Sequence, residues 1–250
     1  MPLAIVHSRG LDGLAALEVA VEVHLAAGLP NVTVVGLPDT EVREARDRVR
    51  AALQNAGFEF PRKRITVNLA PADLPKESGR FDLPIALGIL AASGQIPATA
   101  LAGHEFAGEL SLSGELRPIR GALTMVLAAG GMGRCFVLPA GSAREAALAS
   151  QVPVLAANTL LEVCAHLTGQ AALTECLVDD TVRDDQCIDY PELADVRGQA
   201  QAKRGLEIAA AGEHSLLLAG PPGTGKSMLA SRLPGLLPPM TLAAALESAA

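Results

Sequence analysis

The sequence predicts an α/β protein of two blocks, and three observations support this fold class. In the first block, apolar residues alternate along short strands that pair as hairpins and later alternate with helices, as in a mixed α/β domain. In the second block, a glycine-rich loop separates an apolar run from a helix. Between the blocks, residues 175–195 contain eight acidic residues and one basic residue, which together account for the net charge of −7.

The composition limits the kinds of protein that the chain could be. Of its 250 residues, 50% are hydrophobic and 19% are charged, so the chain can bury sizeable cores and is not wholly disordered. Aromatic residues make up only 2%, which disfavours a platform for stacked bases. No apolar run is long enough to span a membrane and no secretory signal is visible, so we expect no membrane partner and a cytoplasmic location. The cysteines form no CxxC pair, which disfavours a zinc site and fits reduced thiols.

The first block is predicted to cover residues 1–168. Residues 17–25 alternate as in a half-buried strand, and residues 31–36 are expected to pair with it after a turn at Gly28 and Pro30. The remaining predicted elements are, in order, a helix at 40–55, a strand at 65–70, a helix at 82–93, strands at 105–111 and 115–119 that meet at Ser113-Gly114, a helix at 120–130, a strand at 135–138, a helix at 142–150, a strand at 153–156 and a helix at 158–168.

The second block is predicted to cover residues 190–250. Residues 169–189, which precede it, lose the apolar periodicity and gain aspartates, so we expect an acidic linker there. Within the second block the pattern predicts a helix at 200–211, a buried strand at 215–219 and a helix at 225–232.

A phosphate-binding loop is the most specific motif of the chain. Its residues match the pattern G-x-x-x-x-G-K-[ST], with an apolar strand before it and a helix after it, as the motif requires. The glycines let the backbone N–H groups point at phosphate oxygens, Lys226 can reach the terminal phosphates, and the Ser227 hydroxyl can bind Mg²⁺. The sequence therefore predicts binding of ATP or GTP with Mg²⁺. The loop consists of Gly220, Pro221, Pro222, Gly223, Thr224, Gly225, Lys226 and Ser227.

The proline pair inside this loop resembles the phosphate loops of the AAA+ family. Upstream, residues 195–199 (DVRGQ) resemble the box that contacts adenine in that family. The resemblance implies that Val196 and Gly198 flank the base and favour ATP over GTP, and that the second block is the first part of a P-loop AAA+ domain. The alternative is an ordinary turn at the entry to a helix.

A P-loop ATPase also needs a carboxylate at the end of a second apolar strand, which holds Mg²⁺ and helps to activate water. The residues that follow Ser227 contain no such strand, and Glu247 lies in an alanine-rich helical pattern. We therefore expect the chain to be the N-terminal part of a longer ATPase, and to bind ATP without turning it over appreciably.

Two stretches of the first block resemble the Lon-protease-like domain that precedes the ATPase in ComM/YifB proteins, which are AAA+ members of the magnesium-chelatase group. They are residues 67–86 (VNLAPADLPKESGRFDLPIA) and 108–121 (GELSLSGELRPIRG). The resemblance covers the whole chain, with both blocks in the family's order. It implies a fold like ribosomal protein S5 domain 2 for residues 1–168. It also implies a homo-hexameric motor that uses ATP to drive branch migration of DNA in natural transformation, with branched or single-stranded DNA as the partner.

Three other hypotheses remain beside this motor. The first block disfavours a magnesium-chelatase subunit, because the chelatase ATPases of pigment pathways resemble only the second block of this chain. A non-catalytic scaffold fragment is a further alternative. A peptidase is disfavoured because the Ser–Lys pair of active Lon domains has no counterpart: the place of the serine falls near Phe81 or Asp82, and the place of the lysine falls at Leu123. Lys76 and Ser78 are close in sequence but need not face one another.

A basic stretch is the remaining candidate site. Residues 42–64 carry a net charge of +4, and Arg43, Arg46 and Arg50 fall at helical spacing on one face. Such a face could contact DNA phosphates. The alternative is a solvated helix whose arginines pair with the acidic residues interleaved among them.

Overall fold

The computed structural model describes residues 3–13, 15–36, 40–74, 76, 79–149, 151–177 and 190–250, with the backbone alone described at 40–43. The chain forms two compact units that divide near residue 178, and each is described by itself. Most of the predicted linker, together with Cys187, lies outside the described residues. None of the helices in the described ranges is both long and apolar enough to cross a membrane.

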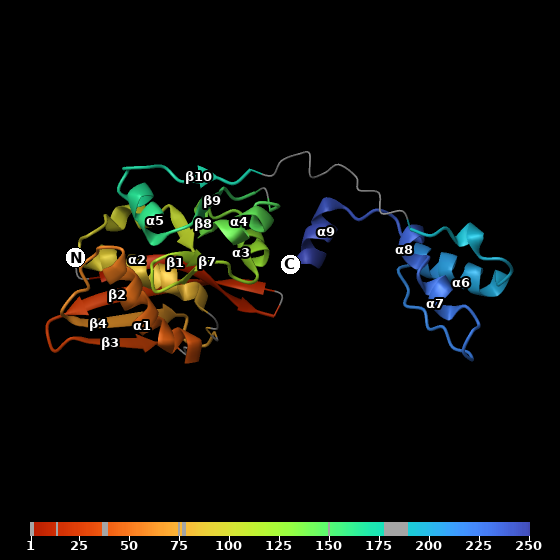
Figure 1. The fold of residues 1–250 in the computed structure, drawn as a ribbon, viewed down its shortest axis with the longest axis horizontal. Helices are drawn as coiled ribbons and strands as arrows, with labels where there is room; N and C mark the ends of the chain where they lie inside the picture. The colour runs from red at the N-terminus through yellow and green to blue at the C-terminus, as the bar shows by residue number, and fades with distance from the viewer. Residues whose placement is uncertain are drawn as a thin grey trace. The chain divides into compact units, whose positions relative to one another are not determined.

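One mixed sheet of eight strands organises the first unit. In chain order its strands are β1 (Leu3–Asp12), β2 (Ala15–Ala26), β3 (Asn31–Val35), β4 (Arg64–Ala70), β5 (His104–Phe106), β8 (Cys135–Pro139), β9 (Val154–Ala157) and β10 (Thr174–Glu175). They lie side by side in the order β10-β9-β8-β5-β1-β2-β4-β3 (Figure 1). The pairs β1–β2 and β2–β4 are antiparallel, whereas β1, β5, β8 and β9 pair in parallel. The sheet therefore joins an antiparallel half to a parallel half at the contact of β1 with β5.

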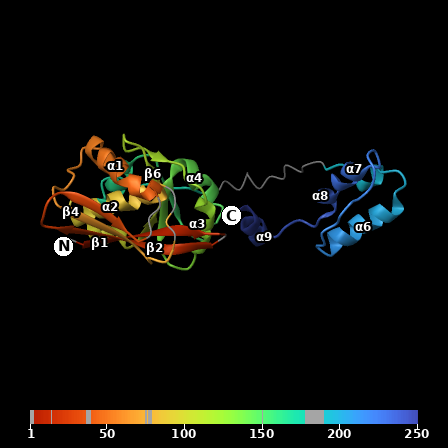
Figure 2. The same ribbon diagram turned by 90° about the horizontal axis from the view of Figure 1, so that it is seen from below.

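Two helices cover the antiparallel half, α1 (Thr40–Asn55) and α2 (Asp82–Ala92) (Figure 2). Val19, Val21 and Val23 alternate along β2, are 0% exposed and belong to the same apolar cluster as the residues of α2. Every residue of α2 is buried, so this helix fills the centre of the unit. Gly88 permits the close packing, because a Cβ there would lie 2.5 Å from Cγ2 of Val23.

The parallel half carries three further helices, α3 (Ala122–Ala128), α4 (Ala140–Ala146) and α5 (Leu160–Leu167). Helix α4 packs against α3 and against β8 and β9. Buried residues of α5, Val163 and Leu167 among them, join the apolar cluster of α2. A separate hairpin of β6 (Glu109–Leu110) and β7 (Leu116–Arg117) turns at Ser113-Gly114, as predicted.

The structure corrects three predictions for the first block. Strand β1 was not predicted, because the polar Ser8 and Arg9 interrupt its apolar pattern although both are buried. The segment 31–36 does not pair with 17–25, because β4 lies between β2 and β3, and β3 pairs in parallel with β4. The continuous strand predicted at 105–111 is divided into β5 and β6, which belong to different sheets.

The second unit consists of helices in its described residues. They are α6 (Ala200–Ala211), α7 (Lys226–Ala230), α8 (Leu233–Leu236) and α9 (Leu242–Ala249). Helix α6 has the predicted bounds. The predicted strand at 215–219 was wrong: no residue from 190 to 250 is in a strand, and Leu217 is 90% exposed. A strand needs a neighbour for its backbone hydrogen bonds, and the described residues of this unit supply none.

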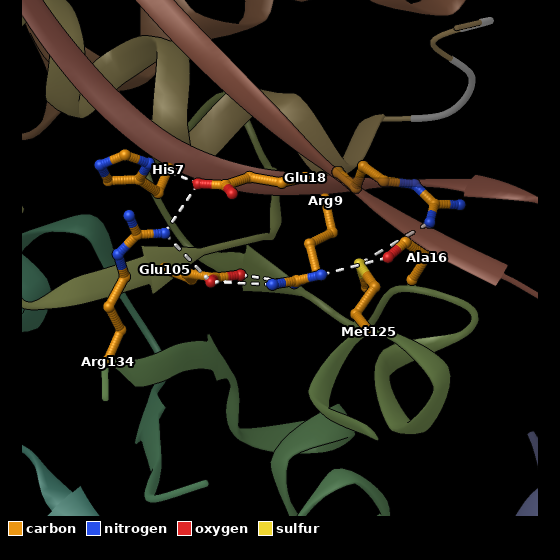
Figure 3. Close-up of polar contacts among 8 residues, drawn as sticks. His7, Arg9, Ala16, Glu18, Glu105, Met125 and Arg134 are labelled. Carbon is orange, nitrogen blue, oxygen red and sulfur yellow. Dashed lines mark hydrogen bonds and ion pairs between the residues drawn. The ribbon is translucent and has the colours of Figure 1, made fainter. Parts of the chain in front are cut away.

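A buried ion network joins the two halves of the large sheet (Figure 3). Arg9 of β1 donates to both carboxylate oxygens of Glu105 on β5, with Nε–Oε2 at 2.7 Å and Nη2–Oε1 at 3.1 Å. Both side chains are at most 5% exposed. Arg134 lies 2.7 Å from Glu18 and 3.4 Å from Glu105, and His7 Nδ1 lies 3.0 Å from Glu18. The hydrogen bond from Arg134 lowers the pKa of Glu18.

Strand β10 places the end of the first unit beyond residue 168. It pairs with β9, the N–H of Cys176 donates to the carbonyl oxygen of Val154 at 2.7 Å, and Leu173 packs on the main apolar cluster. The N–H of Leu173 also donates to Nδ1 of His166 at 3.2 Å. The strap formed by residues 169–177 is therefore part of the folded unit.

Replacing Glu105 by leucine should be strongly destabilising. The substitution leaves the guanidinium of Arg9 buried without its carboxylate, which costs about 3–5 kcal/mol in comparable sites. The double variant Arg9→Met/Glu105→Leu should lose less stability than Glu105→Leu alone, because no buried charge is left unpaired. Asp47→Asn, which removes an exposed ion pair, is the control and should change the free energy of unfolding by less than about 1 kcal/mol. Chemical denaturation measures all four proteins, and equal losses in the single and double variants would contradict this account.

The first unit should fold by itself when it includes the strap. A fragment of residues 1–177 should melt in one cooperative transition, because its core is complete. A fragment that ends at residue 168 should melt roughly 3–10 °C lower, since it loses the packing of Leu173 and the pairing of β10. Calorimetry of the two fragments measures the difference. A non-cooperative melt of the longer fragment, or identical melts, would show that the unit ends elsewhere.

Candidate functional site

The predicted phosphate loop is an exposed turn that leads into α7 in the second unit. Three of its glycines have positive φ angles, 154° at Gly220, 83° at Gly223 and 83° at Gly225. Side chains with a Cβ rarely adopt this conformation, so the curled backbone needs glycine at these positions. A Cβ placed on Gly223 would meet no heavy atom within 4 Å, which shows that the space beside the loop is open.

Lys226 lies across the loop that precedes it. Its Nζ donates to the carbonyl oxygens of Gly220 at 2.8 Å and Pro221 at 2.7 Å, and lies 3.4 Å from Oγ1 of Thr224. These partners are neutral oxygens, and an ammonium group bonds more strongly to anionic phosphate oxygens. The loop therefore holds a cation that can exchange its own carbonyl contacts for those of a phosphate group. Ser227 follows in the first turn of α7.

The box at residues 195–199 lies beside this loop. The Nε2 of Gln199 donates to the carbonyl oxygen of Thr224 at 2.9 Å, and both Gly198 and Gln199 have positive φ angles, of 69° and 55°. Val196 is only 2% exposed and packs with Leu206 and Leu229 in the small core of this unit. The box and the loop are thus brought together, with Val196 as an anchor in the core.

Gln199 is a site residue that the sequence analysis did not select. It stands inside the box that was singled out, but its role depends on a hydrogen bond to a residue 25 positions away. Its amide fixes the backbone carbonyl of Thr224 and so holds the loop against the start of α6. In the sequence, the one signal for Gln199 was its position next to Gly198 in the box.

In the first unit, the positions that the predicted Lon-like resemblance would assign to a catalytic serine and lysine are buried. Phe81 and Asp82 are 0% exposed, and Leu123 is 2% exposed. Lys76 is buried as well, its Nζ donates to the carbonyl oxygen of Pro71, and burial lowers its pKa. Ser78 lies outside the described residues.

Asp82 instead forms a buried ion pair. Arg48 of α1 donates from Nε to Oδ2 at 2.8 Å and from Nη2 to Oδ1 at 3.1 Å, and the N–H of Leu110 donates to Oδ2 at 3.2 Å. These bonds join α1, α2 and the β6–β7 hairpin. Burial raises the pKa of Asp82 to about 6, although the contacts with Arg48 and Leu110 act in the opposite direction.

The candidate DNA-binding arginines of α1 have different environments. Arg46 forms an exposed ion pair with Asp47, with Nε–Oδ1 at 3.2 Å. The guanidinium carbon of Arg50 lies 5.3 Å from the centre of the Phe60 ring. The side chain of Arg43 lies outside what the structure describes. Arg46 and Arg50 line one hollow with Arg62 and two other residues of the following segment, Lys63 and Phe60.

Comparison with known families assigns the chain to a class of protein. A family model described as "Subunit ChlI of Mg-chelatase" matches residues 21–142, and one described as "Magnesium chelatase, subunit ChlI" matches residues 192–250. The two matches together cover more than half of the chain. The chain therefore belongs to the magnesium-chelatase ChlI family. The first of these two models matches residues within the first block. The first block therefore no longer disfavours the chelatase hypothesis.

Individual relatives in this family are similar over the whole chain. The protein YifB of Salmonella typhimurium is 53% identical over 250 residues, which is 100% of this chain and 49% of that protein. YifB of Escherichia coli is 52% identical over the same span. The competence protein ComM of Haemophilus influenzae is 53% identical over 254 residues, again 100% of this chain and 49% of the relative. The chain spans about half the length of the curated relatives that it matches.

The buried Asp82 should make stability depend on pH in a defined direction. Its folded pKa of about 6 lies above the unfolded value of 3.8, so the folded state binds the proton more tightly. Protonation of Asp82 therefore adds to the free energy of unfolding. This contribution is complete below the unfolded pKa and is lost as the pH rises through about 6. Relative to Asp82→Asn, the native chain should gain about 2 kcal/mol of stability between about pH 7.5 and about pH 4.5.

Urea denaturation of both proteins across this pH range measures the effect. His166, whose pKa is lowered by burial, is present in both proteins, so its contribution cancels in the difference. Parallel stability curves for the two proteins would show that Asp82 does not titrate in this range.

Proposed function

We propose that the chain is the ATP-binding, N-terminal part of a ComM-type AAA+ motor that acts on DNA. The observation that carries this proposal is the geometry of the phosphate loop, with Lys226 inside a turn of three positive-φ glycines. The loop amides and the Lys226 ammonium form a cradle for anionic phosphate groups. The bond from Gln199 to Thr224 keeps that cradle in register with α6.

The donor set fits a nucleotide with Mg²⁺. Lys226 would bind the terminal phosphates, and the hydroxyl of Ser227 would bind the metal ion, which neutralises phosphate charge when it is present. Val196 and Gly198 are the proposed neighbours of the adenine, and Val196 also packs in the small core of this unit, from which it supports the box. The residues from Met228 to Ala250 contain no apolar strand followed by an acidic pair, so we propose that this chain binds ATP without hydrolysing it appreciably.

The DNA-directed part of the proposal is supported by the family relationship. The whole chain is 53% identical to a protein named a competence protein. We propose a cytoplasmic homo-hexamer that drives branch migration, with branched or single-stranded DNA as its partner. A proteolytic role is not supported, since the positions of the Lon-type serine and lysine are buried and occupied by other residue types.

A magnesium-chelatase-like ATPase subunit is the second candidate function. It is favoured by the descriptions of both matching family models. The two candidates share the nucleotide site and differ in the partner that the motor acts on. Titration of the chain with a labelled four-way DNA junction and, separately, with a porphyrin separates them. Binding of the porphyrin without binding of the junction would favour the chelatase-like subunit.

Replacing Lys226 by alanine should weaken ATP binding about 10- to 150-fold. The substitution removes a charge-assisted contact worth roughly 1.5–3 kcal/mol. Lys203→Ala is the matched control, because the Lys203 side chain on α6 makes no hydrogen bond or ion pair within the described residues. A fluorescent ATP analogue titrated with and without Mg²⁺ measures binding, and phosphate release is followed in parallel.

Equal affinity of Lys226→Ala and the native chain would contradict the assignment of the loop as the nucleotide site. Steady phosphate release by the native chain, abolished in Lys226→Ala, would show that a catalytic carboxylate is already present and that the proposed absence of turnover is wrong.

A further inference from the structure

A basic groove lies in the first unit, far along the chain from the phosphate loop. It is a hollow of about 330 Å³ between α1, the start of β3 and the segment that leads into β4. Its chemistry-bearing residues are Arg46, Asp47, Arg50, Phe60, Arg62 and Lys63, and these define the basic groove. Four cations face one carboxylate, so the groove attracts anions.

The cations of the groove are largely available to a ligand. Arg50, Arg62 and Lys63 are exposed, and none of them forms an ion pair with a carboxylate in the part of the chain that the structure describes. Arg46 pairs with Asp47, but both side chains are exposed, at 48% and 75%, and such pairs exchange partners at little cost. The solvated-helix alternative, which concerns the arginines of α1, is met by Arg46 and by the pair of Arg48 with Glu44 at 4.0 Å, whereas Arg50 forms no such pair within the described residues.

One of these cations is held in place by an aromatic ring. The guanidinium of Arg50 lies 5.3 Å from the centre of the Phe60 ring, and Phe60 packs against the main apolar cluster. A cation–π contact restricts the guanidinium while its N–H groups stay free for a ligand. The planar fork of arginine matches the geometry of a phosphate group.

A second hollow borders the basic groove and shares part of its lining. The second hollow has a volume of about 350 Å³ and shares Pro61, Arg62 and Lys63 with the first. Glu59 and Gln95 also line it, and the backbone N–H of Glu59 donates to Oε1 of Gln95 at 3.0 Å. The second hollow adds no cation of its own, so the four cations of the basic groove, on α1 and on the segment before β4, carry the argument. Several separate cations suit the repeated charges of a polymer better than a single phosphate.

We propose that the basic groove binds the phosphodiester backbone of a nucleic acid strand. Phe60 is occupied by Arg50 and by the core, so the groove contacts phosphates without stacking bases and does not select a sequence. The choice of nucleic acid as the ligand rests on the proposed function, in which the motor acts on DNA. The position of the site and the residues that form it are inferred from the basic groove alone.

The test is the binding of the 250-residue chain to a fluorescein-labelled single-stranded DNA of about 30 nucleotides, at several salt concentrations. Arg50→Glu/Lys63→Glu should weaken binding at least about tenfold at about 50 mM salt. It should also reduce the slope of log K against log salt by about 0.7 for each phosphate that the variant no longer neutralises. Arg120→Glu/Arg144→Glu is the matched control, with the same change in charge at two exposed arginines that form no ion pair within the described ranges.

A variant with smaller changes keeps the result interpretable if the reversal affects folding. Arg50→Gln/Lys63→Gln removes the same two cations without adding acidic charge, so it should reduce the slope to a similar extent with a smaller loss of affinity, and circular dichroism verifies that each variant is folded. Unlabelled DNA should displace the probe, whereas inorganic phosphate and polyglutamate at equal charge should not. Displacement by polyglutamate would overturn the proposal in favour of an acidic protein partner. Equal weakening in the groove variants and the control would show that only net charge matters.

The outcomes for the groove and for the nucleotide site are separable. Lys226→Ala should leave binding of the DNA probe unchanged, and Arg50→Glu/Lys63→Glu should leave binding of the ATP analogue unchanged. Loss of ATP binding alone would contradict the proposed function and leave the groove intact. Absence of DNA binding by a native chain that still binds ATP would overturn the groove proposal and leave the proposed nucleotide site standing.

Discussion

The contact between β1 and β5 is the constraint on which the first unit depends. An antiparallel half of the sheet meets a parallel half there, and His7 with Glu105 forms the one residue pair between the two described strands. The buried pair of Arg9 with Glu105 reinforces this contact, and Arg134 ties the same carboxylate to Glu18 on β2 (Figure 3).

A second buried ion pair determines what α1 presents to solvent. Arg48 is used to neutralise Asp82 beneath the helix, at a position where the Lon-like resemblance would place a nucleophile. This contact anchors α1 on α2 and leaves the opposite face of the helix outward. Arg46 and Arg50 on that face then meet Arg62 and Lys63 from the next segment, which turns scattered charges into one basic groove. The ion pair at Asp82 and the proposed binding at the basic groove therefore both require the same orientation of α1.

The two candidate sites differ in how much of the molecule they need. The phosphate loop is formed by eight consecutive residues whose glycines set the backbone, and it is present although residues 215–219 are not in a strand. Its link to Gln199 is the one long-range contact that the described loop residues make with the box. The basic groove depends instead on how α1, the start of β3 and residues 60–63 are brought together, and therefore on the tertiary structure of the first unit.

Local patterns in the sequence were enough to locate the glycine-rich turn of the predicted phosphate loop, the helices at 40–55 and 200–211 and the alternation of β2, because each depends on residues that are close along the chain. Pairing between distant residues decided the rest. The apolar pattern did not predict β1, because the polar residues Ser8 and Arg9 interrupt it. A buried arginine is tolerated only where a partner such as Glu105 neutralises it, and that partner lies far along the chain. The same dependence placed β4 between β2 and β3 and left 215–219 without a strand, because hydrogen bonds between strands belong to the pair and not to either sequence alone.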